Sequence, residues 1–275
     1  MRKTIGIALL LVAAGYAFAQ TGEVPSDMVR ISGGTFTMGS PANEPGRYDD
    51  EGPQHQVTVS SFYMGKYEVT QREYQEVMGT NPSSFKGDNL PVESVSWYDA
   101  VEYCNRLSEK EKLTPAYTID KNRKDGNNDN EYDEIKWTVR WNRNANGYHL
   151  PTEAEWEYAC RAGTTTAYNT GVSITNNTGW YHDNSAGSTH EVGQKPANAW
   201  GLYDMHGNVW EWCWDWYGKY ASDTQTDPAG ASAESDRVVR GGGWLSSAQF
   251  VRSAFRGCDT PSKRDSGFRL ARAGQ

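Results

Sequence analysis

The sequence lacks the features that mark three broad classes of protein. Its net charge of −8 argues against a nucleic acid as the main partner, because binding to phosphates needs clustered Lys and Arg. The apolar run from Ile5 to Ala14 is too short to span a membrane, so no transmembrane segment is predicted. The cysteines show no CxxC spacing and are too few for a disulfide-stapled scaffold, although they allow one optional bridge; they are Cys104, Cys160, Cys213 and Cys258.

Signatures of common enzymes are missing as well. The five histidines show no His-x-x-x-His spacing, and neither a Gly-x-Ser-x-Gly elbow nor a phosphate-binding loop motif occurs. His206, which stands beside Gly207, is compatible with a ligand contact or with an ordinary hydrogen-bonded loop residue. Motif spacing alone therefore points to no catalytic centre.

Residues 1–19 have the pattern of a secretory signal peptide. Arg2 and Lys3 give a basic start, an apolar run follows, and Ala17-Phe18-Ala19 forms a small-x-small ending, so cleavage is expected before Gln20. Residues 20–27 then form a linker to the folded domain. The predicted location is exported: the periplasm, the cell surface or the medium.

The remaining chain has the composition of a globular α+β protein. With 37% hydrophobic and 12% aromatic residues, it can bury a sizeable core. Capping boxes that begin at Thr70, Ser96 and Thr152 predict three helices. Short strands are predicted at Met28 to Ile31 and Gly34 to Gly39 about a Gly33-Gly34 turn, at His55 to Val59, and in a hairpin that joins Ala116–Ile119 to Lys136–Val139.

An aromatic stretch near residue 210 predicts a core strand. Trp210, Trp212, Trp214 and Trp216 alternate with Val209, Glu211, Cys213 and Asp215. A period of two places one set on each face of a strand, so one face carries the tryptophans and the other carries carboxylates. Such aromatic area is too large for a solvated loop.

Asp204 and Glu211 bracket a tight turn at Gly207-Asn208. Carboxylates together with free backbone carbonyls are the ligands that a hard cation such as Ca²⁺ selects. The alternative is that the two carboxylates cap the turn or pair with an arginine.

Six ordered motifs resemble the formylglycine-generating-enzyme or sulfatase-modifying-factor family. They are Gly33–Gly39, Pro91–Trp97, Leu150–Tyr158, Gly207–Trp212, Arg240–Gly242 and Gly267–Arg269. The resemblance implies one domain over residues 28–272 with a C-type-lectin-like fold, consisting of small mixed sheets, few helices and much irregular structure. It also implies Ca²⁺ ligands residue by residue: the side chain of Asp204, the carbonyls of Gly207 and Val209, and the carboxylate of Glu211.

The resemblance breaks at the copper site. Enzymes of this family bind copper through two cysteines in the segment that follows Arg-Gly-Gly, but Gly243 to Arg252 contains none. Without a pair of thiolates there is no soft Cu(I) site, so no copper and no catalytic residue is predicted. Cys258 has no second cysteine near it in the sequence. It is compatible with a reactive thiol or with a small structural side chain.

Residues 239–269 form a variable-looking segment. Family-like residues alternate there with chemically unrelated ones, as in bacterial proteins that retroelements diversify on a C-type-lectin-like scaffold. Exposed apolar residues among such a mixture are typical of a binding face. The predicted ligand-binding residues are Leu245, Ser246, Ser247, Gln249, Phe250, Phe255, Gly257, Cys258, Asp259, Asp265 and Ser266.

These patterns predict an exported, non-catalytic, receptor-like or adhesin-like protein, monomeric, that binds a protein or a glycan. The alternatives are an enzyme that reuses the family pocket without copper and a structural role in an exported assembly. In the scaffold, Trp244, Ala254 and Phe268 are expected to be buried. The guanidinium groups of Arg252, Arg256 and Arg269 are expected to bond to backbone carbonyls or carboxylates.

Overall fold

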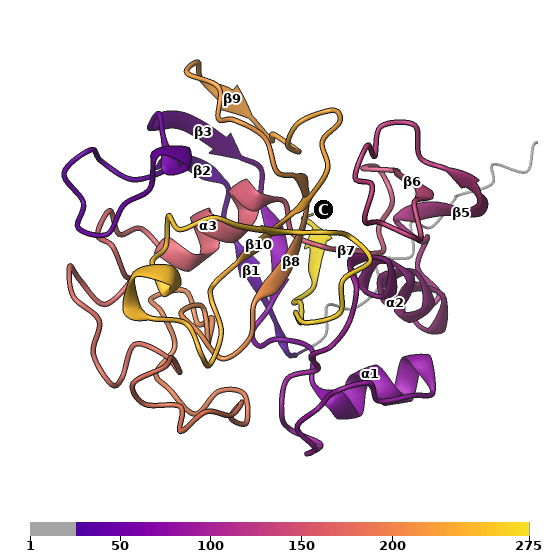
Figure 1. Cartoon of the computed structure of the whole chain (residues 1–275), viewed down its shortest axis with the longest axis horizontal. Coiled ribbons are helices and arrows are strands. Elements are labelled where there is room, and N and C mark those ends of the chain that lie inside the picture. Colours follow the sequence, from indigo (N-terminus) through magenta and orange to yellow (C-terminus); the bar gives the residue numbers. More distant parts are fainter. Residues whose placement is uncertain (1–25, 275) are drawn as a thin grey trace, which may run out of the picture.

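The computed structural model describes residues 26–274, which form three α-helices, α1 (Gln71–Met78), α2 (Trp97–Lys110) and α3 (Glu153–Arg161). Each helix begins at a predicted capping box. The hydroxyls of Thr70, Ser96 and Thr152 accept a hydrogen bond from the third helical N–H, and the side chain at that position bonds back to the cap. Helices α1 and α2 lie together at one side of the molecule, while α3 lies over its centre (Figure 1).

The strands form four small sheets, and two short 3₁₀ helices lie outside them, η1 (Asp49–Glu51) and η2 (Ala248–Val251). The first sheet has the order β1 (Met28–Ile31), β4 (Phe62–Gly65), β12 (Ala271–Ala273), β7 (Tyr148–His149). The second has the order β2 (Gly34–Met38), β3 (His55–Val59), β9 (Gln225–Thr226), and the third β11 (Gly257–Asp259), β10 (Arg237–Arg240), β8 (Glu211–Trp216). The predicted hairpin pairs β5 (Tyr117–Lys124) with β6 (Trp137–Trp141).

This architecture confirms the predicted fold class: few helices, small mixed sheets and much irregular structure. The β3–β9 pair is parallel and the other strand pairs within the sheets are antiparallel. Among the described residues, every helix is too short or too polar to cross a bilayer.

The two strands predicted about the Gly33-Gly34 turn are confirmed as β1 and β2. The turn joins two sheets, because β1 pairs with β4 and β2 pairs with β3. A Cβ atom at Gly33 would lie 2.8 Å from the nitrogen of Ser61 and the carbonyl oxygen of Val59, so this crossing of two backbones requires glycine.

Strand β8 is the predicted core strand. Trp212 is fully buried, and its indole nitrogen donates to the carbonyl oxygen of Val95 at 3.0 Å. Arg237 of the neighbouring strand β10 lies between two indoles, its guanidinium carbon 3.8 Å from the ring centre of Trp97 and 3.5 Å from that of Trp216. The tryptophan face is therefore closed by a buried cation on aromatic rings.

Candidate functional site

Four buried arginines hold the segment 239–269 to the rest of the chain. The guanidinium group of Arg252 donates to the carboxylates of Glu44 and Glu51, both in the loop after β2. It also reaches the carbonyl oxygens of Gly46 at 2.8 Å and Gln249 at 3.0 Å. Its bonds to Glu44, Gly46 and Glu51 join residues 239–269, which we call the display segment, to a loop that lies far away in the sequence.

Arg256 and Arg240 bind the segment to helix α3. The Nε and Nη2 atoms of Arg256 lie 2.6 and 2.8 Å from the two carboxylate oxygens of Glu153, and Arg240 donates to Glu157 and to the carbonyl of Ser253. Burial disfavours the charge of Glu153, but Arg256 and Arg240 hold the pKa of its carboxyl below its ordinary value. The roles predicted for Arg252, Arg256 and, as shown below, Arg269 are confirmed.

Between these anchors, most of the predicted ligand-binding side chains reach solvent. Leu245, Ser247, Gln249, Cys258 and Asp265 are exposed, and Ser246, Phe250, Phe255, Gly257 and Asp259 are partly exposed. Leu245 is 62% exposed, which is unusual for a large apolar side chain. The segment thus combines buried cations with an outward surface.

Two predictions about this segment are wrong. Ser266 is buried, because its carbonyl accepts a hydrogen bond from the backbone N–H of Val95 in a short bridge, so it cannot belong to an exposed face. Trp244 is only partly buried and packs edge-on against Phe85, with ring centres 5.5 Å apart. The predicted burial of Ala254 and Phe268 is confirmed.

Four aromatic rings gather at the surface into what we call the aromatic patch: Tyr48, Trp210, Phe250 and Phe255. The ring centre of Phe255 lies 5.0 Å from that of Phe250, 5.6 Å from that of Tyr48 and 5.9 Å from that of Trp210. Sequence reasoning missed Tyr48, which is 43% exposed. The sequence did offer a signal for this contact: the loop around Tyr48 is acidic, and its Glu44 and Glu51 pair with Arg252 of the display segment.

The predicted metal ligands lie together, but Glu211 is engaged by protein groups. The Nε and Nη2 atoms of Arg269 each lie 2.6 Å from one of its carboxylate oxygens, and the indole nitrogen of Trp156 donates to the same carboxylate at 2.7 Å. Arg269 also donates to the carbonyl of Tyr203 at 3.0 Å. This is the arginine pairing that the sequence left open as an alternative to Ca²⁺.

Asp204 offers a better fit to a cation. Its Oδ2 atom accepts from the N–H of Gly193 at 2.7 Å, whereas its buried Oδ1 atom has no hydrogen-bond partner among residues 26–274. Burial raises the pKa of Asp204 to about 6. Gly207 adopts a positive φ of 114°, and a Cβ atom there would lie 1.9 Å from the carbonyl oxygen of Trp180, so the turn requires glycine.

Glu68 is a third carboxylate beside Asp204 and Glu211, and sequence reasoning missed it. We call these three residues the acidic centre. Glu68 is fully buried and accepts from the side-chain amide of Asn208 at 2.7 Å and from the N–H of Val209 at 3.1 Å. Burial, and then the charges of Asp204 and Glu211, raises the pKa of Glu68. Within residues 26–274, however, no three His, Cys, Asp or Glu side chains converge closely enough to hold a metal by themselves.

The four cysteines differ in their exposure. Cys104, Cys160 and Cys213 are buried free thiols, and Cys258 is an exposed one. Burial raises the pKa of Cys160 to about 12, so this thiol stays protonated at neutral pH. The buried His206 bonds through Nδ1 to the carbonyl of Val251 at 2.7 Å and accepts at Nε2 from the N–H of Asn169, which is the ordinary loop role.

Comparisons with known proteins identify relatives of this chain over most of its length. A model of the sulfatase-modifying factor enzyme 1-like domain matches residues 15–274. A protein of Paenibacillus barcinonensis named chaperone protein LppX is 42% identical, over 94% of this chain and 93% of its own length. The formylglycine-generating enzyme of Mus musculus is 29% identical, over 89% of this chain and 74% of its own. The solved structure of Treponema denticola variable protein 1 is 35% identical, with a TM-score of 0.77 over 90% of this chain and 95% of that one.

Proposed function

Because the chain belongs to the sulfatase-modifying factor enzyme 1-like domain family, we propose that it is an exported, non-catalytic ligand-binding member that presents residues 239–269 as a recognition face. One observation carries the proposal: buried arginines that hold the backbone alternate with side chains that reach solvent. The likeness to Treponema denticola variable protein 1 supports it. A scaffold of this kind tolerates changes at the exposed positions without losing its packing.

The aromatic patch defines the chemistry of the face. The exposed side chains of Tyr48 and Leu245 and the partly exposed rings of Phe250 and Phe255 offer large apolar contacts. The aromatic rings lose little conformational entropy on binding. Gln249 donates to the hydroxyl of Tyr48 at 3.2 Å and adds polar groups at the rim. Such a surface suits a protein or a glycan ligand.

The DNA around the coding sequence tests the diversified face. We expect a nearby reverse transcriptase gene and an imperfect copy of the codons for Gly241 to Arg269. Substitutions among close relatives should concentrate at exposed positions such as Leu245 and Gln249 and spare Arg240, Arg252 and Arg256. A locus without either element, with Leu245 and Gln249 constant among relatives, would contradict diversification.

An assay for formylglycine formation tests the alternative that the protein is an enzyme. This alternative stands because a relative from Mus musculus is named formylglycine-generating enzyme. We expect the purified protein, supplied with Cu(I) and a sulfatase-type cysteine peptide, to leave the cysteine unchanged, because Gly243 to Arg252 holds no thiolate pair. Mass spectrometry of the peptide measures the outcome, and an active enzyme of the family serves as control. Copper-dependent loss of the thiol with gain of an aldehyde would overturn the non-catalytic assignment.

Variants of the aromatic patch separate binding from stability. Because Phe255 contacts three other rings, Phe255→Ala should lower the free energy of unfolding by about 1–2 kcal/mol, more than the ~0.5 kcal/mol expected of a fully exposed residue. It should also abolish binding to any glycan or protein selected from an array. Val172→Ala, at an exposed apolar position outside the segment, is the matched control and should change neither. Equal binding by both variants would remove the patch from the proposed face.

Calcium remains part of the proposal, with Asp204 and the carbonyls of Gly207 and Val209 as the ligands the geometry leaves available. Support comes from the three carboxylates of the acidic centre, which face the single guanidinium group of Arg269. We expect EGTA to lower the melting temperature and Ca²⁺ to restore it, by linkage between binding and folding. In Asp204→Ala the two conditions should give the same melting temperature. A wild-type protein that melts identically with Ca²⁺ and with EGTA would exclude the ion.

A chaperone activity is a second candidate, favoured by the 42% identity to a protein named chaperone protein LppX. Exposed apolar rings also contact unfolded chains, so the aromatic patch is compatible with this role. Suppression of aggregation of a heat-unfolded test protein, lost in Phe255→Ala, would favour it. Conserved residues on the face together with that activity would favour the chaperone over the diversified receptor.

A further inference from the structure

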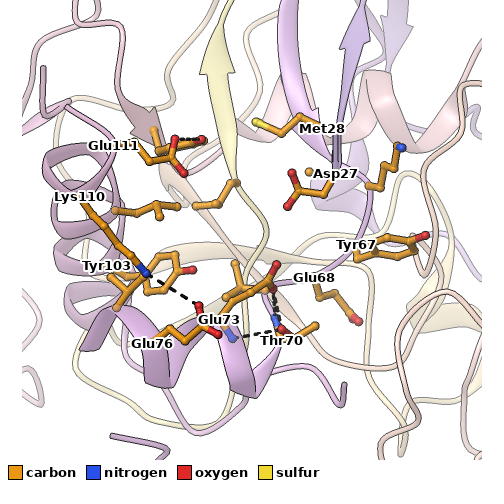
Figure 2. Close-up of a pocket in the computed structure, with 17 residues that line it drawn as sticks. Asp27, Met28, Tyr67, Glu68, Thr70, Glu73, Glu76, Tyr103, Lys110 and Glu111 are labelled. Carbon is orange, nitrogen blue, oxygen red and sulfur yellow. Dashed lines mark hydrogen bonds and ion pairs between the residues drawn. The ribbon is translucent and has the colours of Figure 1, made fainter. Parts of the chain in front are cut away.

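A cavity of about 230 Å³ lies between helices α1 and α2 and the adjoining ends of β1 and β4 (Figure 2). Residues 239–269, all of which the structure describes, do not line it. Its apolar wall consists of Met28, Val77, Leu107 and Leu270. The cavity is thus separate from both the aromatic patch and the display segment, and it has room for a small aliphatic chain.

Carboxylate oxygens without a partner surround this apolar wall. Asp27 makes no side-chain hydrogen bond within residues 26–274. Glu73 uses only Oε2, for the capping box of Thr70, and Glu111 uses only Oε2, which accepts from the hydroxyl of Tyr148 at 2.6 Å. Figure 2 shows these carboxylates around the open space. Acceptors for a cation therefore remain free on three sides.

The two lysines of the cavity are engaged elsewhere. The Nζ atom of Lys66 donates to the carbonyl of Ser26 at 2.7 Å, and that of Lys110 lies 3.9 Å from Glu76 on α1. Neither lysine forms an ion pair with Asp27, Glu73 or Glu111. The walls consequently keep an excess of negative charge.

Tyr103 gives an independent indication of a ligand. Its side chain is 1% exposed, yet its hydroxyl makes no hydrogen bond to any group in residues 26–274. In Figure 2 the hydroxyl points from α2 toward the open space. Burial, followed by the charge of Glu73, raises the pKa of Tyr103, so the group stays a phenol. With no partner in the part of the chain that the structure describes, this hydroxyl is free to bond to a molecule in the cavity, which Tyr103 lines.

We propose that this cavity binds a primary ammonium group on an aliphatic chain, as in a free diamine or the side chain of a peptide lysine. An ammonium group donates three hydrogen bonds, and the cavity walls offer it free acceptors in a carboxylate oxygen of Asp27, one of Glu111 and the hydroxyl of Tyr103. The methylene groups lie against Met28 and Leu107. A bare metal ion does not fit, because no three carboxylates in residues 26–274 converge to metal-ligand distance.

Titration of the full-length protein with 1,5-diaminopentane and with N-acetyl-lysine methylamide tests the proposal by calorimetry. Both probes carry the ammonium group. Tighter binding of the diamine identifies the natural ligand as a free amine, and tighter binding of the lysine derivative identifies it as a peptide lysine. Pentane-1,5-diol, which has the same chain without the charge, should bind at least about tenfold more weakly. Binding should weaken as salt rises and disappear above about pH 10.5, where the amine loses its proton.

Variants identify the contacts. Asp27→Asn and Glu111→Gln, at exposed positions that leave the fold intact, should each weaken binding about tenfold, and Tyr103→Phe about threefold to tenfold. Glu131→Gln, an exposed carboxylate outside the cavity, is the control and should bind like the wild type. Absence of amine binding at millimolar concentration, binding of the diol equal to that of the diamine, or an unchanged Asp27→Asn/Glu111→Gln double variant would each overturn the proposal.

Discussion

Arg269→Met should lower the free energy of unfolding by about 3–5 kcal/mol, since it leaves the buried carboxylate of Glu211 without its partner. The guanidinium group also serves the carbonyls of Gly65 and Tyr203, so the variant leaves several acceptors unsatisfied at once. Arg269→Lys should restore only part of the loss, because an ammonium group cannot form the paired bonds of the planar fork. Chemical denaturation monitored by tryptophan fluorescence measures the difference.

The control for this prediction is Arg264→Met. Arg264 pairs with Asp99 at 2.8 Å but half of its side chain is exposed, so its loss should cost less than about 1 kcal/mol. The double variant Arg269→Met/Glu211→Gln should be more stable than Arg269→Met, because it removes the unpaired charge as well. Similar losses for Arg264→Met and Arg269→Met would show that burial of the ion pair is not what matters.

Trp212→Ala should cost about 3–5 kcal/mol, as a large aromatic truncation in the core. The side chain is fully buried in β8, and its removal also leaves the carbonyl of Val95 without its donor. Trp212→Phe should recover most of the packing but not the hydrogen bond, and should cost about 1–2 kcal/mol. Equilibrium unfolding in urea checks both values.

The same residue type two positions earlier gives the matched comparison. Trp210 is only partly buried and belongs to the aromatic patch, so Trp210→Ala should lower stability by about 1–2 kcal/mol, well below the cost at Trp212. Equal losses for the two variants would show that the partly exposed Trp210 contributes as much to the core as the fully buried Trp212.

Local patterns predicted the elements well because their causes are local. The capping boxes at Thr70, Ser96 and Thr152 satisfy neighbouring backbone groups, so four consecutive residues are enough to predict where each helix begins. The tryptophan alternation likewise identified β8 as a core strand. Pairing between distant segments has no such local signature, so nothing near Gly33-Gly34 indicates that β1 pairs with β4 and that β2 pairs with β3.

The candidate site shows the same limit. That Arg252, Arg256 and Arg269 bond to carbonyls and carboxylates followed from their chemistry, but their partners lie far away in the sequence and had to come from the structure. Glu68 was missed because nothing near it in the sequence marks the acidic centre, and Tyr48 was missed because its acidic loop pairs with an arginine about 200 residues away. Ser266 was placed on the surface because side-chain chemistry says little about a residue buried through a backbone bridge.

Strand β12 lies inside its sheet, between β4 and β7, although it is formed by Ala271–Ala273 (yellow in Figure 1). A growing polypeptide therefore cannot complete this sheet until residues 271–273 have left the ribosome, and every earlier intermediate exposes the edges of β4 and β7. Joining strands so distant along the chain is entropically expensive and makes folding slow. Folding of this sheet is therefore expected to lag behind the formation of elements built from local contacts, such as the capped helices.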